Sequence, residues 1–325
     1  MVISQTPMRM SFFGGGTDFP EFFREHSGAV ISTTFDKYCH VNVREMPDLF
    51  EYKTYLSYAK IEKVCSADEI QHPAIRNAMK WLGLEKICLN YDADVPAKTG
   101  LGTSSAFSVG MLNAFYTMMG EEKTKRQLAD GAIYLERTLC NEDGGIQDQI
   151  ASAFGGFNRI DFTEEGYTVT PVDFCDGRKE QLEENLMLFF TGLSRYSFQV
   201  QKTTKKMLPH NTVRLLKMLK MVDEAEDILT NPQRNLNDFG YLLNETWLEK
   251  REISSEISTD YIDVAYKKAI EAGALGGKLL GAGGGGCLLF YAEKDKQEYV
   301  RKALSDMHEF PFRFENEGTK IICKY

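Results

Sequence analysis

The sequence predicts a protein of mixed strands and helices arranged in two units. Its 325 residues suggest roughly two domains at about 150 residues each. In the first half, strand-like runs such as AVISTTF, HVNVRE and KICLNYDAD alternate with helical patterns, and a second unit begins near LEENLMLFFTGLSR. We therefore expect domains over residues 1–172 and 173–325, with the boundary placed to within about ten residues.

Each unit has its own pattern of elements. In the first unit, apolar residues recur every four positions after LGTSS, which predicts one buried helix face. These residues are Phe107, Met111, Phe115 and Met119. A hairpin over residues 156–172, with Glu165 and Gly166 at its turn, closes this unit. In the second unit we expect a strand at GCLLFYAE and helices over about residues 212–229, 236–257 and 295–308.

The composition excludes several classes of protein. A net charge of −9 argues against a nucleic-acid partner or a polybasic membrane anchor, and it leaves room for a small basic pocket. The N-terminus lacks a signal-peptide pattern and no apolar run approaches the length of a membrane helix, which predicts a cytoplasmic protein without a membrane partner. Seven scattered cysteines without a C-x-x-C pair indicate reduced thiols. The sequence leaves the oligomeric state open, with a homodimer as one possibility.

Three glycines near the N-terminus, Gly14, Gly15 and Gly16, precede Thr17 and Asp18. Residues without a Cβ let the backbone approach a ligand closely or adopt a positive φ. An ordinary glycine turn is the alternative explanation for this stretch.

A second glycine loop, PAKTGLGTSSA, runs from the end of a predicted strand into the helix described above. A helix start offers unpaired N–H groups and the positive end of the helix dipole, both of which favour phosphate. The residues expected to hold a nucleotide phosphate are Gly100, Leu101, Gly102, Thr103, Ser104 and Ser105. Simple helix capping is the alternative, although a cap requires neither two glycines nor three hydroxyls.

Two common nucleotide-binding motifs do not fit. The segment GGKLLG comes closest to a Walker loop, but Leu279 stands where that loop needs a hydroxyl. The string GAGGGG at residues 281–286 matches G-x-G-x-x-G, yet it follows a predicted helix and opens a strand. A dinucleotide-binding motif has the reverse order, so we exclude it.

The motifs PMRMSFFGGGTD, PAKTGLGTSSA and KLLGAGGGGC, in this order over nearly the whole chain, resemble the three signature motifs of the GHMP small-molecule kinases. The resemblance implies an α+β fold, with an N-terminal α/β domain that contains a left-handed βαβ crossover and a C-terminal ferredoxin-like domain. It also implies that ATP binds at the second motif together with Mg²⁺. General handedness rules disfavour such a crossover, so composition and spacing alone would not predict it.

Within this family, FFGGGTDFP, CNEDGGIQDQIASAFGGFN and FFTGLSR most resemble bacterial kinases of D-glycero-D-manno-heptose 7-phosphate. Those enzymes phosphorylate the anomeric C1 oxygen, giving the 1,7-bisphosphate for nucleotide-activated heptose synthesis. Galactokinases carry Gly-Glu-His-Thr-Asp where this chain has Gly14 to Asp18. The resemblance implies that the glycines bring backbone N–H groups near the substrate and that Asp18 accepts hydrogen bonds from sugar hydroxyls, with an Asx-turn as the alternative for Asp18.

The resemblance also assigns the chemistry of phosphoryl transfer. Ser105 and Glu136 would bind Mg²⁺, with Ser104 as an alternative to Ser105 and a surface carboxylate as the alternative for Glu136. Asp148, in GGIQDQIAS, matches the catalytic aspartate and would accept the proton of the substrate hydroxyl or orient it, with a helix-start carboxylate as the alternative. Arg9 would stabilise negative charge on the attacking oxygen and the transferred phosphoryl group.

A phosphate on the substrate needs basic contacts of its own. Arg195, in TGLSRYS, is the first candidate, and Lys98 and Lys202 are weaker ones for which a surface charge is the equal alternative. Gly283 and Gly284 of the third motif are expected at the substrate site, where the loop would press closely on the nucleotide or on the first motif.

Two other functions remain open from the sequence. One is a kinase for an unphosphorylated sugar such as fucose; an isoprenoid-pathway kinase fits the Thr17-Asp18 pair less well. The other is a catalytically silent sugar sensor on the same fold. The candidate chemical groups that argue against a silent protein are Asp148, Glu136, Ser105 and Arg9.

Overall fold

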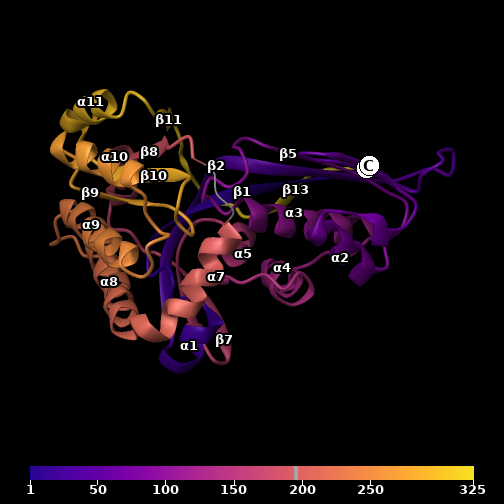
Figure 1. Ribbon diagram of the computed structural model, residues 1–325, viewed down its shortest axis with the longest axis horizontal. Coiled ribbons are helices and arrows are strands. Elements are labelled where there is room, and N and C mark those ends of the chain that lie inside the picture. The colour runs from indigo at the N-terminus through magenta and orange to yellow at the C-terminus, as the bar shows by residue number, and fades with distance from the viewer. Residues whose placement is uncertain (194–196) are drawn as a thin grey trace.

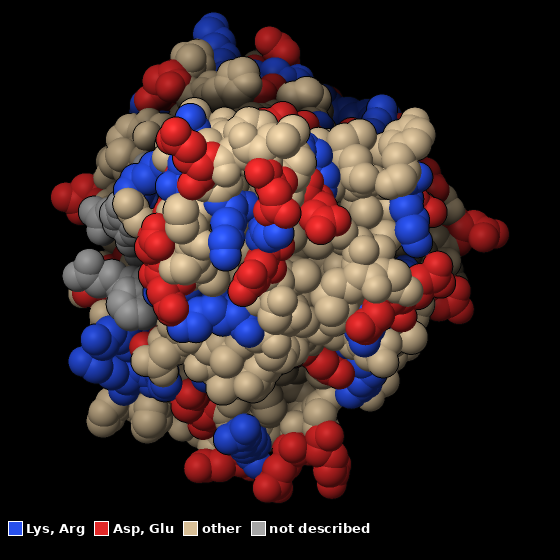
Figure 2. All heavy atoms as spheres, turned by 90° about the vertical axis from the view of Figure 1, so that its right-hand side faces the viewer, with Lys and Arg blue, Asp and Glu red and all other residues tan. Residues whose placement is uncertain are grey.

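The computed structural model describes residues 1–193 and 197–325. Figure 1 shows an elongated molecule, with a long sheet and its helices at one end and a second, smaller sheet with its helices at the other. On the end face shown in Figure 2, acidic and basic side chains are interspersed, and that face presents no broad basic surface among its described residues. Among the residues described, no helix is both long and apolar enough to span a bilayer.

The first sheet is built on two long antiparallel strands, β1 (Val2–Phe13) and β2 (Gly28–Glu45). Its strand order is β13-β1-β2-β5-β3-β4, with β12 and β6 also paired to β2 and with β7 paired to β6. The remaining strands are β3 (Thr54–Ser57), β4 (Ile61–Val64), β5 (Ile87–Ala93), β6 (Phe157–Thr163), β7 (Gly166–Pro171), β12 (Phe314–Glu315) and β13 (Lys320–Lys324). The predicted runs AVISTTF and HVNVRE are therefore parts of one continuous strand, β2.

The predicted hairpin that closes the first unit is β6–β7, but its turn lies one residue earlier than expected. Thr163 pairs with Gly166 across the hairpin, so Glu164 and Glu165 form the turn. Gly166 is already part of β7 and has a φ of 141°.

Helices cover the first sheet and supply much of its core. They are α1 (Pro20–His26), α2 (Pro73–Leu82), α3 (Thr103–Met118), α4 (Lys125–Ile133) and α5 (Gln147–Phe154), with a 3₁₀ turn η1 (Ala67–Glu69) and a π-helical segment η2 (Tyr134–Leu139) that continues α4. In α3, Phe107, Met111 and Phe115 are buried, as the spacing predicts. Met119 is 41% exposed because α3 ends at Met118.

The second sheet has the order β11-β8-β10-β9, with every pair antiparallel. Its strands are β8 (Leu186–Phe190), β9 (Gly276–Leu279), β10 (Cys287–Tyr291) and β11 (His308–Phe310). Helices connect β8 to β9, and α11 connects β10 to β11, which is the ferredoxin-like arrangement. The mixed α+β fold with this second domain type is therefore confirmed.

The helices of the second unit include two that end earlier than their sequence patterns predict. They are α6 (Arg178–Asn185), α7 (Ser197–Met207), α8 (Thr212–Thr230), α9 (Asn237–Arg251), α10 (Asp260–Glu271) and α11 (Lys294–Ala303), with a 3₁₀ turn η3 (Leu208–Asn211). The helix expected over 236–257 stops at Arg251, and the helix expected over 295–308 stops at Ala303.

The end of the chain returns to the first sheet. Strand β13 pairs with β1, and Thr319 hydrogen-bonds Thr6 through their hydroxyls at 2.7 Å. Figure 1 shows β13, in yellow, lying beside the indigo strands at the end of the molecule far from α11. The division at residue 172 stays a prediction, and the last strands connect the predicted second domain to the sheet of the first.

Candidate active site

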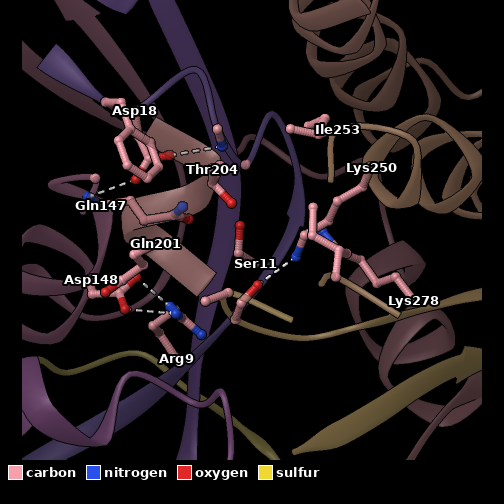
Figure 3. Close-up of a pocket in the computed structure, with 17 residues that line it drawn as sticks. Arg9, Ser11, Asp18, Gln147, Asp148, Gln201, Thr204, Lys250, Ile253 and Lys278 are labelled. Carbon is pink, nitrogen blue, oxygen red and sulfur yellow. Dashed lines mark hydrogen bonds and ion pairs between the residues drawn. The ribbon is translucent and has the colours of Figure 1, made fainter. Parts of the chain in front are cut away.

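A pocket lies between the first and third glycine loops, where the two sheets meet, and Arg9 connects it to the second loop by a hydrogen bond to Gly100. Its lining comes from β1, from the glycine loop after β1, from the start of α5, from α7 and α9, and from β9 with the loop after it. Figure 3 shows Arg9, Asp148, Gln147 and Asp18 on one side of this pocket, Lys250 and Lys278 on the other, and Ser11 between them. The pocket therefore brings together first-unit and second-unit side chains that are far apart in the sequence.

Arg9 and Asp148 form the central ion pair of the pocket. The Nε and Nη2 atoms of Arg9 each donate to one carboxylate oxygen of Asp148, both at 2.7 Å. Arg9 also donates from Nη1 to the carbonyl oxygen of Gly100 at 2.7 Å, and its side chain is 4% exposed. Asp148 is 24% exposed and faces the pocket. This bidentate pair fixes both groups in position next to the second glycine loop.

The first glycine loop holds Asp18 at the pocket wall. The Oδ1 atom of Asp18 accepts a hydrogen bond from the backbone N–H of Gly16 at 2.9 Å, and its Oδ2 atom accepts one from the N–H of Gln147 at 3.4 Å. A Cβ on Gly145 would lie 1.7 Å from Oδ2 of Asp18, so glycine is required there. Burial raises the pKa of Asp18, and the nearby Asp148 carboxylate adds to this increase.

Thr17 has a structural position in the same loop. Its fully buried hydroxyl shares its single proton between the carbonyl oxygens of Gly14 and Ala29, at 2.8 and 2.9 Å, and accepts from the N–H of Ala29. Gly14 has a φ of 79°, and a Cβ on it would lie 1.9 Å from the oxygen of Ala29. Thr17 and Gly14 thus hold the loop against β2, while Gly15, Gly16 and Asp18 line the pocket.

The second glycine loop packs its helix start over a buried carboxylate. Ser105, in the first turn of α3, donates from Oγ to Oε2 of Glu136 at 3.0 Å. Gln149 of α5 also donates to Oε2 of Glu136. Glu136 is 5% exposed and lies in the π-helical segment η2, a type of segment often found at functional sites. Glu136 is therefore a buried residue of the site and not a solvated surface carboxylate.

The surroundings of Glu136 fit a bound cation. Its Oε1 atom is buried and makes no hydrogen bond of good geometry among the described residues, although the Ser108 hydroxyl lies close enough to lower the pKa of Glu136. Burial raises the pKa of Glu136 to about 7, with the Glu142 carboxylate as a second cause. No cluster of three or more His, Cys, Asp or Glu side chains suited to a metal occurs in the described ranges. A hydroxyl and a single carboxylate are nevertheless a set that Mg²⁺ can use, because it takes its other ligands from water and substrate phosphates.

The third glycine loop packs directly on the second. A Cβ on Gly100 would lie 2.4 Å from the carbonyl oxygen of Leu280, and a Cβ on Gly281 would lie 2.5 Å from Cα of Gly100. The N–H of Cys287 also donates to the carbonyl oxygen of Thr99 at 3.0 Å. The third motif therefore supports the second motif, and glycine is needed where the two backbones meet.

Several predicted residues lie outside the pocket lining. Gly283 and Gly284 pack near Ile257, and the N–H of Gly284 donates to the Ile257 oxygen at 2.9 Å. Leu101 is fully buried, and its carbonyl oxygen accepts from the N–H of Arg9 at 3.0 Å. The remaining predicted residues that the described pocket lining does not include are Gly14, Thr17, Gly100, Gly102, Thr103, Ser104, Ser105, Glu136, Lys98 and Lys202. Arg195 falls in the segment outside the described residues.

The pocket residues that the sequence did not predict include Lys250, Lys278 and Ser11, together with the polar residues Gln147, Gln201 and Thr204. Lys250 follows Thr246 and Trp247 by four and three residues, so it lies on the buried face of α9. Lys278 lies within β9, in the segment GGKLLG, where all four residues of the strand are buried. Ser11 follows Arg9 by two positions on β1 and therefore shares its face of the sheet. A lysine among apolar residues on a predicted helix face was the signal available for Lys250.

Comparisons with known proteins identify the class of this fold and site. Residues 68–156 match the GHMP kinases N terminal domain, and residues 225–309 match the GHMP kinases C terminal domain. The chain belongs to the GHMP kinase family. It is therefore a kinase with ATP as its phosphoryl donor, as the second glycine loop predicts.

Individual relatives span most of the chain. It is 29% identical to a D-glycero-alpha-D-manno-heptose 7-phosphate kinase of Campylobacter jejuni, over 98% of this chain and 97% of that protein. It is 26% identical to an L-fucokinase/L-fucose-1-P guanylyltransferase of Bacteroides fragilis, over 93% of this chain and 35% of that longer protein. A crystal structure of a D-glycero-D-manno-heptose 1-phosphate kinase from Bacteroides thetaiotaomicron shares the fold, with a TM-score of 0.74, 23% identity and full coverage of both chains.

Proposed function

We propose that this protein transfers the γ-phosphoryl group of ATP to the anomeric C1 hydroxyl of D-glycero-D-manno-heptose 7-phosphate. The product would be the 1,7-bisphosphate, an intermediate for nucleotide-activated heptose. The similarity to the Campylobacter jejuni kinase over 98% of the chain supports this substrate. The single structural observation that carries the proposal is the Arg9–Asp148 pair, which faces the pocket beside the nucleotide loop.

Asp148 is proposed to bind the reacting hydroxyl. Each of its carboxylate oxygens accepts one hydrogen bond from Arg9, which leaves lone pairs that can accept another. The C1 hydroxyl of a reducing sugar is more acidic than an ordinary alcohol, so a modest base is sufficient to orient it and take its proton.

Arg9 is proposed to act at the same step through its charge. Its guanidinium contacts both the Asp148 carboxylate and the carbonyl of the nucleotide loop, so it lies between the acceptor and the donor. Charge on the transferred phosphoryl group would develop beside a group that is already fixed.

Ser105 and Glu136 are proposed to hold the metal that accompanies ATP. Mg²⁺ bound there would neutralise phosphate charge. The orphaned Oε1 atom of Glu136 and the hydrogen bond from Ser105 to Oε2 support this assignment over one to Ser104. The α3 N-terminus, from Gly102 to Ser105, would bind the phosphates through its backbone N–H groups.

The glycine loop with Asp18 is proposed to bind the sugar. Gly15, Gly16 and Asp18 line the pocket near Asp148, so sugar hydroxyls could reach Asp18 while C1 faces Asp148. Arg195 stays a predicted contact to the 7-phosphate, and the cytoplasmic location stays a prediction. The structure does not describe Arg195, and the oligomeric state remains open.

The first experiment is an ADP-release assay with MgATP and a panel of heptose 7-phosphate, free heptose, fucose, galactose and mevalonate. We expect turnover with heptose 7-phosphate, and ³¹P NMR should show the new phosphate at C1. Turnover restricted to fucose would reject heptose 7-phosphate as the substrate and favour fucose, the sugar named for the Bacteroides fragilis relative. Tight sugar binding without any turnover would instead identify a silent sensor.

A further inference from the structure

Two buried lysines face the pocket without a carboxylate partner in the described part of the chain. Lys278 is 2% exposed and Lys250 is 8% exposed. Lys278 donates from Nζ to the carbonyl oxygen of Phe12 at 2.7 Å, and Lys250 donates to the carbonyl oxygens of Leu279 and Gly281. Both side chains line the pocket, and Figure 3 shows them on the side opposite Asp18 and Asp148.

The ammonium groups retain donors that the protein does not use. An ammonium group has three N–H donors, and the described residues accept one from Lys278 and two from Lys250. Ser11, which is 6% exposed and also lines the pocket, has a hydroxyl without a hydrogen-bond partner among the described residues. A ligand with several acceptor oxygens would satisfy all three groups.

The charges of the pocket residues indicate that this ligand is negatively charged. Arg9, Lys250 and Lys278 can bring three positive charges, whereas Asp18 and Asp148 can bring two negative ones, and Asp148 is already paired with Arg9. Burial lowers the pKa of Lys250 to about 8 and lowers that of Lys278 as well, and the neighbouring cations add to both effects. A dianion entering the pocket would supply the missing negative charge.

A purely structural role explains these lysines poorly. Burying an ammonium group to satisfy one or two carbonyls is unfavourable, because desolvation of the charge outweighs the hydrogen bonds gained. Apolar residues of similar size would fill the same volume without this penalty. The unfavourable burial is explained if a phosphate completes the site.

We infer that Lys250, Lys278 and Ser11 form a binding subsite for the phosphate monoester of the sugar substrate. This inference rests on the proposed function. It assigns the contacts to the phosphate of the sugar substrate to three residues that the structure describes. Ser11 lies two residues beyond Arg9 on β1, or about 6.6 Å along the strand. That displacement, toward the first glycine loop, separates the subsite from the Arg9–Asp148 pair, where phosphoryl transfer is proposed.

The test compares Lys278→Met, Lys250→Met and Ser11→Ala with the wild-type protein by isothermal titration. The probes are heptose 7-phosphate, unphosphorylated heptose, inorganic phosphate and MgATP. We expect affinity for heptose 7-phosphate and for inorganic phosphate to fall about tenfold to a hundredfold in each lysine variant and about threefold to tenfold in Ser11→Ala. Affinity for the free heptose and for MgATP should change less than about twofold.

Lys217→Met is the matched control. Lys217 is 55% exposed and pairs with Glu249, next to Lys250 in the chain, so this variant removes a positive charge near α9 without changing the pocket. Thermal melting of each apo protein checks folding. Lys250→Met and Ser11→Ala keep the test decisive if Lys278→Met does not fold.

The possible results distinguish failure of the proposed phosphate subsite from failure of the proposed function. Equal losses for phosphorylated and free heptose would overturn the inference, because they would indicate a general change of the pocket. Losses confined to MgATP would also overturn it and assign the lysines to the nucleotide phosphate. Turnover of heptose 7-phosphate with an unchanged KM in the lysine variants would reject the subsite and keep the function. Lysine-dependent binding of inorganic phosphate without turnover of heptose 7-phosphate would reject the function and support a phosphate subsite.

Discussion

Three carboxylates of the site differ in their surroundings, and these differences suit them to different roles. Asp148 is paired with Arg9 through both oxygens. Asp18 is buried and accepts mainly from backbone N–H groups, and burial raises its pKa. Glu136 accepts from neutral side chains and has one orphaned oxygen. These differences support the proposal that Asp148 binds the acceptor hydroxyl, Asp18 the other sugar hydroxyls and Glu136 the cation.

Replacing Asp148 by Asn tests the first of these roles. The amide keeps the shape but cannot accept a proton, and it loses the ion pair with Arg9. We expect kcat to fall about a hundredfold or more, with KM for the sugar changed much less. Asp161→Asn is the control, since Asp161 pairs with Arg159 away from the pocket. Turnover within about threefold of wild type would show that Asp148 is dispensable.

The buried ammonium of Lys250 predicts a pH-dependent stability difference. Its pKa is lowered from 10.5 to about 8 in the folded protein. Below the folded pKa, the charged lysine destabilises the native state fully, and this penalty disappears as pH rises toward the unfolded value. The free energy of unfolding of Lys250→Met should therefore exceed that of wild type by about 2 kcal/mol more at pH 7 than at pH 9.5. This figure uses about 1.4 kcal/mol for each unit of pKa shift.

Urea unfolding of both proteins at the two pH values measures this difference. The groups that face Lys250 are Arg9, which lowers its pKa, Asp18 and Asp148, which raise it, and Lys278, whose own pKa Lys250 lowers. Arg9, Asp18 and Asp148 are common to both proteins, so most of their own titration cancels in the comparison. The pKa of Lys278 rises once Lys250 is replaced, which adds to the gain at pH 7 in the same direction. A constant difference between variant and wild type would show that Lys250 is not perturbed.

At the scale of single elements, the contacts between glycine loops decide where catalytic groups lie. The second loop positions the start of α3, and it also accepts a hydrogen bond from Arg9 at Gly100. The third loop packs on the second at Gly281. Glycine is thus needed in these loops for backbone contact as well as for any contact with the nucleotide.

Gly100→Ala tests the contact between the second and third loops. Gly100 has a φ of 77°, and a Cβ there would lie 2.4 Å from the carbonyl oxygen of Leu280. We expect a loss of about 2–4 kcal/mol of stability from strain plus the clash, together with weaker MgATP binding. Gly83→Ala is the control, because Gly83 has a φ of 64° and open space around it. That variant should lose only about 1–2 kcal/mol of stability, from backbone strain alone. Equal losses of stability for the two variants in urea unfolding would contradict the importance of the contact between Gly100 and Leu280.

The π-helical segment η2 supports a second prediction at this scale, through Glu136. Glu136→Gln removes the carboxylate proposed to hold Mg²⁺, so the Mg²⁺ concentration for half-maximal rate should rise at least about tenfold. The metal-free protein should melt at the same or a higher temperature, because a buried charge is lost. Glu142→Gln is the control, since the side chain of Glu142 acts on Glu136 through its charge, and the variant keeps the hydrogen bond from the Glu142 N–H to the Glu136 carbonyl oxygen. An unchanged Mg²⁺ requirement would remove Glu136 from the metal site.

At the scale of the whole molecule, strands from both ends of the chain lie in one sheet. Strand β13 pairs with β1, which carries Arg9 and Ser11 farther along its length. Lys278 of β9 donates to the backbone of Phe12 at the other end of β1. The position of β1 therefore depends on the C-terminal strand as well as on the second sheet.

Removal of residues 318–325 tests this dependence. The truncation deletes β13 and the Thr319–Thr6 hydrogen bond, and it exposes the edge of β1. We expect a loss of at least about 2 kcal/mol of stability in urea unfolding and increased aggregation. Removal of Tyr325 alone is the control, because that residue is 93% exposed and its loss removes only the terminal backbone hydrogen bonds to Met1 while β13 stays in place. Equal stability of both truncated proteins would show that β13 adds little.

Much of the fold follows from local sequence patterns. The buried face of α3 and the antiparallel pairing of β6 with β7 match the predictions because periodicity and turn propensity are local properties. The ends of α9 and α11 do not match, since apolar spacing continues beyond the last helical residue in each case. The pairing of β13 with β1 could not be predicted because it joins residues more than three hundred positions apart.

The sequence by itself determined the chemical groups and their order: three glycine motifs, Arg9 at the first, three hydroxyls at the second, and Glu136 and Asp148 between the second and the third. These motifs are recognisable because glycine and charged residues stand out against an apolar background. Only the tertiary structure decided that Lys250 and Lys278 share a pocket with Asp148, that Thr17 faces β2, and that the third loop packs on the second. The physical reason is that proximity arises from packing between distant segments. The apolar neighbours of Lys250 indicate a buried helix face, but they do not indicate which residues of other elements lie against it.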